Sequence, residues 1–168
     1  MRKLILLLFT IGLCLPALAL AADPSPSAQS QCAAERTAMG ADAFKALYGT
    51  NGNKANAFGK CVSKRAQANG QAESNAAGQC KAERSADPAA FKTKYGTGKN
   101  GANAFGKCVS GKSKTAAAAD VKATENAAKA CWTERKADAV AFSAKYGTGP
   151  KQANAFGKCV SGKVKHSK

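Results

Sequence analysis

Cysteine and lysine are the residues whose types and spacing could do chemistry in this chain. Pairs of cysteines recur three times at nearly constant spacing, as Cys32 and Cys61, Cys80 and Cys108, and Cys131 and Cys159. Each second cysteine lies within the string Asn-Ala-Phe-Gly-Lys-Cys-Val-Ser, so a lysine recurs immediately before it. Cysteines form disulfides or hold metals, and lysines bind anionic groups. The chain therefore offers two kinds of chemistry, each repeated three times.

The spacing of the cysteines favours disulfides over a metal site. Zinc sites use closely spaced pairs of cysteines, which are absent here, and cysteines of secreted proteins usually oxidise. Six cysteines allow many pairings, and sequence alone does not choose among them. If the three copies fold alike, the simplest solution pairs Cys32 with Cys61, Cys80 with Cys108, and Cys131 with Cys159. Each bridge would contribute about 3–4 kcal/mol by restricting the unfolded chain.

The start of the chain is typical of a secretory signal peptide, which we place at residues 1–22. Arg2 and Lys3 precede an apolar run over residues 4–15, and Pro16 is followed by small residues. The run is shorter than the about 20 apolar residues of a spanning helix, so a retained anchor is the weaker interpretation. Cys14 would be removed with the signal. We expect a secreted protein, extracellular or periplasmic, with no transmembrane segment after signal removal.

Enzymatic chemistry lacks a candidate set of residues. His166 is the one histidine, and it lies outside all three copies, so Ser-His or Cys-His catalysis has no constellation. Residues 101–108 match the phosphate-binding loop G-x4-G-K-[ST] except at Cys108, and no strand is expected before them. Each copy retains one glutamate, whereas a paired-carboxylate mechanism needs two acids. We predict no catalytic residue, metal, cofactor or small-molecule substrate.

Recurring lysines make a polyanion-binding surface the remaining candidate. The net charge is +16, which favours anionic partners, although solubility alone explains it equally well. Loop lysines add one charge to each copy at Lys54, Lys99 and Lys151. The tyrosines Tyr48, Tyr95 and Tyr146 could stack on bases or sugars, but core packing against the phenylalanine four residues earlier is the stronger interpretation. The predicted binding residues are Lys60, Lys64, Lys107, Lys112, Lys158 and Lys163.

The sequence therefore leaves three candidate functions. The first is multivalent binding of an anionic polymer or cell surface. The second is an extracellular structural or interaction protein whose basic charge serves solubility only. The third is a cationic membrane-active defence protein, which is disfavoured because the segments after residue 22 are rich in alanine and glycine and lack a strongly apolar helical face.

The elements that must position these residues are short helices. Large apolar side chains are scarce after residue 22, where Leu47 is the one leucine and isoleucine is absent. Small units with few apolar residues usually need disulfides for stability. No segment alternates with period two, and alanine is abundant, which favours helix. We predict an all-α protein of three tandem small disulfide-stapled helical repeats, with about three short helices each, joined by Ala/Lys-rich helical linkers.

The second copy shows the expected helix boundaries best. Asp87 followed by Pro88 predicts the start of a helix that ends at Gly96, and Asn103 is expected to cap the next helix. Gly106 lies one turn into that helix, where close backbone approach would explain a glycine. The predicted organisation is a signal peptide (1–22), an extended leader (23–30), unit 1 (31–64), a linker (65–78) with an Asn-Gly turn signal, unit 2 (79–112), a helical linker (113–129), unit 3 (130–163) and a basic tail (164–168).

Overall fold

A computed structural model describes residues 26–149 and 151–166 of the chain. The predicted signal peptide, the first three residues of the leader and the end of the basic tail lie outside the described residues. Within them the chain is helical and contains no strand, which confirms the all-α prediction. The helices are α1 (Ala28–Met39), α2 (Ala41–Tyr48), α3 (Ala57–Ala86), α4 (Pro88–Tyr95), α5 (Ala104–Ala137), α6 (Ala139–Tyr146) and α7 (Ala155–His166).

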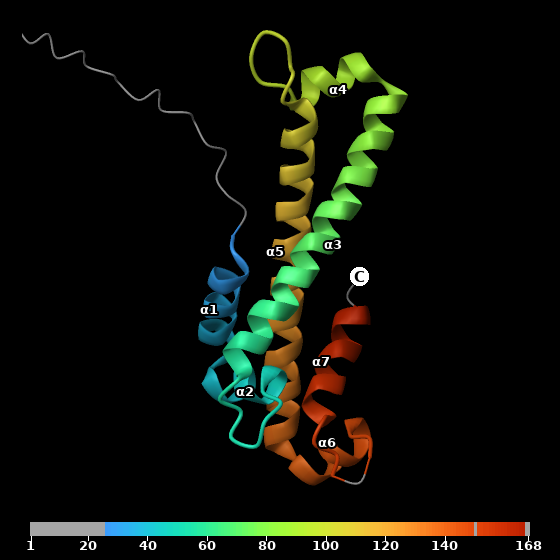
Figure 1. The fold of residues 1–168 in the computed structure, drawn as a ribbon. Coiled ribbons are helices and arrows are strands. Elements are labelled where there is room, and N and C mark those ends of the chain that lie inside the picture. The colour runs from blue at the N-terminus through green and yellow to red at the C-terminus, as the bar shows by residue number, and fades with distance from the viewer. Residues whose placement is uncertain (1–25, 150, 167–168) are drawn as a thin grey trace, which may run out of the picture.

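Two long helices organise the molecule. α3 has 30 residues and α5 has 34, and each runs without interruption from one unit through a linker into the next. Asn69 and Gly70, which predict a turn, lie inside α3, so this local signal is overridden. Figure 1 shows α3 and α5 crossing, with α4 at one end of the molecule and α2 and α6 at the other. α1 packs on α3, and α7 packs on α5. α1 begins at Ala28, so residues 28–30, which were predicted as part of the extended leader, are helical.

Three disulfides fasten neighbouring helices to each other. Cys32–Cys61 joins α1 to α3, Cys80–Cys108 joins α3 to α5, and Cys131–Cys159 joins α5 to α7. The Cα atoms of each pair are 6.0 or 6.1 Å apart, and all six cysteines are fully buried. The structure confirms all three predicted pairings. Each long helix therefore carries one cysteine of each of two bridges.

Units 1 and 3 share one hydrophobic core, whereas unit 2 has its own. The shared core contains both disulfides, together with Phe44, Phe142 and Phe156. In unit 2 the buried core consists of Cys80, Phe91, Ala104 and Cys108. Because α3 runs away from unit 1 and α5 returns to unit 3, the first and third units meet at the same end of the molecule (Figure 1).

Several local signals in the sequence are confirmed. Asp87 Oδ1 accepts hydrogen bonds from the backbone N–H of Ala89 and Ala90, at 3.0 and 2.9 Å, with Pro88 in the first turn. Asp138 caps α6 in the same way. In each unit the tyrosine packs on the phenylalanine four residues earlier, with ring centroids 4.9 to 5.0 Å apart. These contacts place the short second helix of each unit across the disulfide.

Asn103 occupies the predicted cap position of α5 without making the side-chain bond of a cap, and the predicted close approach at Gly106 is wrong. Asn103 precedes α5 but makes no side-chain cap bond. It accepts a hydrogen bond from the Thr97 backbone N–H at 2.9 Å and donates one to Thr97 Oγ1 at 2.6 Å, so it closes the loop between α4 and α5. A Cβ placed on Gly106 would meet nothing within 4 Å. The close approach occurs instead at Gly96, where a Cβ would lie 2.5 Å from the Lys92 carbonyl oxygen.

Candidate polyanion-binding surface

In every unit, the glutamate three residues after the first cysteine accepts a hydrogen bond from a tyrosine hydroxyl and forms an ion pair with a cation. The tyrosine ends the second helix and donates its hydroxyl to the glutamate, and the cation lies four residues after the second cysteine. We call each set a Glu–Tyr–cation triad. The triads are Glu35, Tyr48 and Arg65 in unit 1, Glu83, Tyr95 and Lys112 in unit 2, and Glu134, Tyr146 and Lys163 in unit 3.

The triads change the assignment of two predicted binding residues. Lys112 Nζ lies 2.8 Å from a carboxylate oxygen of Glu83, and Lys163 Nζ lies 3.7 Å from one of Glu134. Both lysines are therefore partly neutralised within their own units. Arg65, the first residue after the predicted end of unit 1, occupies the corresponding position of the first triad, rather than Lys64, so the unit 1 triad extends one residue into the predicted linker. Lys64 lies one residue earlier and is exposed.

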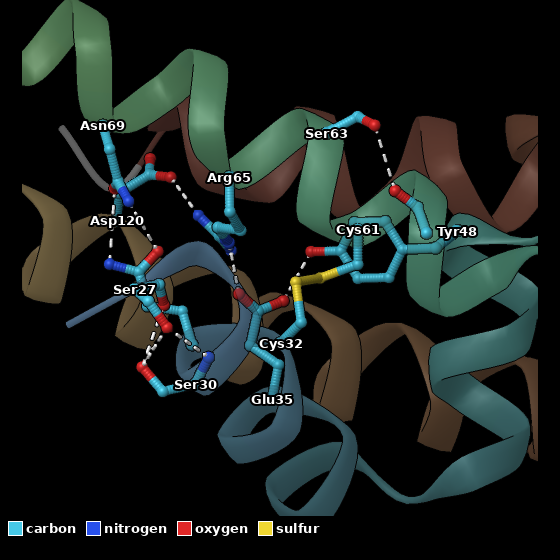
Figure 2. The surroundings of a disulfide bond; sticks show 12 residues. Ser27, Ser30, Cys32, Glu35, Tyr48, Cys61, Ser63, Arg65, Asn69 and Asp120 are labelled. Carbon is cyan, nitrogen blue, oxygen red and sulfur yellow. Dashed lines mark hydrogen bonds and ion pairs between the residues drawn. A yellow bond between two sulfur atoms is a disulfide. The ribbon is translucent and has the colours of Figure 1, made fainter.

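The triad of unit 1 is buried and reaches a second helix. The Arg65 side chain is 5 % exposed and that of Glu35 is 0 % exposed. Arg65 bonds Glu35 through Nε and Asp120 of α5 through Nη1, at 2.6 Å from Asp120 Oδ2. Figure 2 shows Arg65 between these two carboxylates, close to the Cys32–Cys61 disulfide. Burial, together with the neighbouring Glu35 carboxylate, raises the pKa of Tyr48, so the phenol stays a donor.

The triads of units 2 and 3 lie nearer the solvent. Hydrogen bonds from Lys112 and Tyr95 lower the pKa of Glu83 to about 2. A hydrogen bond from Lys145 lowers the pKa of Glu134, and Tyr146 contributes as well. Lys145 Nζ is 2.7 Å from Glu134 Oε1. These carboxylates are therefore charged at neutral pH and hold the cations beside them.

The lysines that precede the second cysteines lie in different surroundings. Lys60 and Lys158 are exposed, and Lys107 is half-buried. Lys60 and Lys107 are remote from each other because units 1 and 2 lie at opposite ends of α3. The structure therefore does not align the six predicted lysines as one stripe. It brings together two of them, Lys64 and Lys158, at the contact between units 1 and 3.

Lys64 and Lys158 line a cleft of about 950 Å³, which we call the unit 1–unit 3 cleft. One wall consists of α2, the loop that follows it, and Lys64 of α3, and the other consists of α7 and the residues before it. Two further lysines line it, Lys54 from the loop and Lys165 from α7. Thr50, Asn51 and Ser161 add hydroxyl and amide groups.

The charge of this cleft is of one sign. No aspartate or glutamate is among the described residues that line it. Within the described part of the chain, none of its four lysines forms an ion pair. Lys64 Nζ lies 5.9 Å from the centre of the Tyr48 ring, a cation–π contact that leaves the ammonium available for hydrogen bonds. Four like charges around one concave site raise the local concentration of anions.

A second groove, between α3 and α5, has a different character. Its volume is about 650 Å³, and Phe105, Val109 and Ala117 give it an apolar floor. Glu73 is its one charged lining residue among those described. This groove lacks the positive charge that an anionic ligand would require.

Sequence reasoning missed two residues of the charged sites. Arg65 could have been found by counting four residues from Cys61, as for Lys112 and Lys163. Lys165 could have been found by counting six residues from Cys159, because Lys114 lies at the same distance from Cys108. The sequence identifies Lys54 as a loop lysine, but its position beside α7 depends on the paths of α3 and α5. The described residues contain no group of three His, Cys, Asp or Glu side chains placed to hold a metal. Among them there is also no helix long and apolar enough to span a membrane.

In the described part of the chain, these contacts form a concave site lined by four lysines where units 1 and 3 meet. Comparisons of the chain with protein-family models, with curated proteins and with solved structures found no match.

Proposed function

We propose that this is a secreted, non-enzymatic protein that binds anionic polymers or surfaces through the unit 1–unit 3 cleft. The observation that carries the proposal is the set of four lysines around that cleft, without an opposing acid among its described lining residues. We also propose that units 1, 2 and 3 are copies of one disulfide-stapled repeat. Their matching triads and disulfides support this reading.

The size and chemistry of the cleft favour a segment of a phosphate- or sulfate-bearing polymer. A cleft of about 950 Å³ lies in the range that holds a drug-sized ligand. Lysine ammonium groups act as point charges that suit tetrahedral anions, and hydroxyl groups such as those of Thr50 and Ser161 add directional bonds. The other exposed lysines, including Lys60, contribute long-range attraction.

Salt dependence of binding tests the proposal. Labelled inorganic polyphosphate and labelled heparin would be titrated with the mature protein, with anisotropy as the readout. Four lysine contacts predict a slope of log affinity against log salt of about −3. Replacing Lys64 and Lys158 together by Gln should lower the affinity about tenfold or more at low salt and halve the slope. Binding weaker than micromolar at low salt without a salt slope would contradict the proposal and favour a structural protein whose charge serves solubility.

A further inference from the structure

One backbone position has the same unusual conformation in all three units. It follows the glycine that ends the second helix by five residues and lies in the left-handed region, with φ of 56° at Lys54, 56° at Gly101 and 45° at Gln152. Glycine adopts this conformation freely, whereas other residues are strained in it. Unit 2 has the unstrained residue, so the fold itself does not require a side chain here.

The stem of the Lys54 side chain covers Gly49. A Cβ placed on Gly49 would lie 2.5 Å from Lys54 Cβ, which shows how closely the two approach. Gln152 covers Gly147 in the same way, at 2.4 Å. Since the neutral Gln152 makes this contact equally well, packing does not explain the charge at Lys54.

The loop that carries Lys54 is held by its own hydrogen bonds, so the backbone of Lys54 is fixed without a ligand. Its loop is closed by Asn56, which accepts a hydrogen bond from the Thr50 backbone N–H at 3.0 Å and donates one to Thr50 Oγ1 at 2.7 Å. The Lys54 backbone N–H donates to the Asn51 carbonyl at 3.0 Å. A cation on a fixed loop loses less conformational freedom on binding than one on a free surface.

We infer that Lys54 is the specificity-determining contact of the unit 1–unit 3 cleft, and that its ammonium meets a phosphate or sulfate group held against α7. The inference rests on the proposed function. Lys54 belongs to unit 1 and Lys158 to unit 3, so a polymer segment bound between them joins the two units. Binding should therefore also raise the thermal stability of the folded chain.

The test uses the residues that the other units carry at this position. Lys54→Gln copies unit 3, keeps the stem over Gly49 and removes the charge. Lys54→Gly copies unit 2 and removes the strain as well. Lys99→Gln is the control, because it removes one exposed loop charge at the other end of the molecule. Affinity for polyphosphate and for heparin, and the melting temperature with and without each polymer, would be measured for all three variants of the mature chain.

Lys54→Gln and Lys54→Gly are each expected to weaken binding about fivefold, with the melting temperature of the free protein unchanged or raised. Lys99→Gln should bind like the unmodified protein. Unequal losses for polyphosphate and heparin would show which anion Lys54 selects. Equal losses would show that Lys54 adds affinity without selecting an anion, and would overturn its assignment as the specificity-determining contact. If Lys54→Gln binds like the unmodified protein while the Lys64 and Lys158 double variant loses affinity, the inference is overturned and the proposed function stands. If neither loses affinity, both are overturned.

Discussion

Arg65 Nη1 and Asp120 Oδ2 lie 2.6 Å apart, and this ion pair joins unit 1 to the middle of α5. Asp120 belongs to the helical linker between units 2 and 3, so the contact is formed by residues far apart in the sequence. Arg65 also bonds Glu35, so one guanidinium links the disulfide of unit 1 to the helix that leads into unit 3. The contact therefore ties α3, which carries Lys64 of the unit 1–unit 3 cleft, to α5.

Removing the arginine should therefore destabilise the protein strongly. Arg65→Met leaves the buried Glu35 carboxylate without its cation, and breaking a buried pair in this way costs about 3–5 kcal/mol. Urea denaturation followed by circular dichroism would measure the change. Lys64→Met is the matched control, because it alters the exposed neighbouring residue, and it should change the free energy of unfolding by less than about 0.5 kcal/mol. Equal losses in the two variants would refute the assignment of Arg65 to the triad.

Lowering the pH should reduce the stability of unit 2, because Glu83 loses its charge. The ordinary pKa of a glutamate side chain is 4.5. In the folded protein the pKa of Glu83 is lowered to about 2, because Lys112 and Tyr95 donate hydrogen bonds to the carboxylate. A lowered folded-state pKa means that the contribution to stability is complete above the unfolded pKa and is lost as the pH falls toward about 2.

The comparison of the unmodified protein with Glu83→Gln isolates this effect. The stability difference between the two proteins should be largest at pH 6, shrink below about pH 4.5 and vanish near pH 2. Urea midpoints at these pH values would measure it. A difference that stays constant over this range would mean that Glu83 titrates normally in the folded chain.

The disulfide of unit 2 should act locally. Unit 2 has a core of four buried residues that is separate from the shared core of units 1 and 3. Replacing Cys80 and Cys108 by alanine removes a bridge across 28 positions, worth about 3–4 kcal/mol. Hydrogen exchange should accelerate mainly over residues 80–108. The corresponding change at Cys131 and Cys159 should accelerate exchange in both units 1 and 3, and a uniform response to both double variants would contradict the two-core description.

Two glycines of unit 2 should respond to alanine with opposite signs. At Gly96 a Cβ would lie 2.5 Å from the Lys92 carbonyl oxygen and 2.6 Å from Gly101 Cα, so Gly96→Ala should cost about 2 kcal/mol or more. At Gly106 a Cβ would meet nothing within 4 Å, and the residue lies inside α5, so Gly106→Ala should gain about 0.5–1 kcal/mol. Thermal unfolding of both variants would measure these changes in stability. A loss of stability in Gly106→Ala would mean that the surroundings of Gly106 are tighter than described.

Much of the local structure could be predicted from the sequence because its causes are local. Repeated spacing indicated the pairing of Cys80 with Cys108, and Asp87 with Pro88 marked the start of α4. The Asn69–Gly70 signal failed because a turn signal is weak against the packing of a continuous α3 on α5. Tyr95 was expected to pack on Phe91, which it does, but its hydroxyl bond to Glu83 needed the geometry of two helices.

The site was less predictable because it forms between units. Residues such as Lys64 and Lys158 are separated by two long helices, and nothing in their local sequence indicates that they meet. The expectation of repeated binding faces treated the units as equivalent. In the fold, units 1 and 3 contact each other and unit 2 stands apart, so residues at matching positions have different neighbours. Lys112 and Arg65 illustrate this, since the first is half-buried and the second is buried against α5.

The most direct measurement compares two sets of lysine substitutions that remove the same charge. One set replaces the cleft lysines Lys54, Lys64, Lys158 and Lys165 by Gln, and the other replaces the exposed lysines Lys81, Lys99, Lys122 and Lys129, which lie outside the cleft. Affinity for polyphosphate at low salt is the readout. The cleft set should lower affinity about a hundredfold and abolish most of the salt slope, whereas the second set should change it less than about threefold. Equal losses from the two sets would show that net charge, and not the cleft, attracts the polymer.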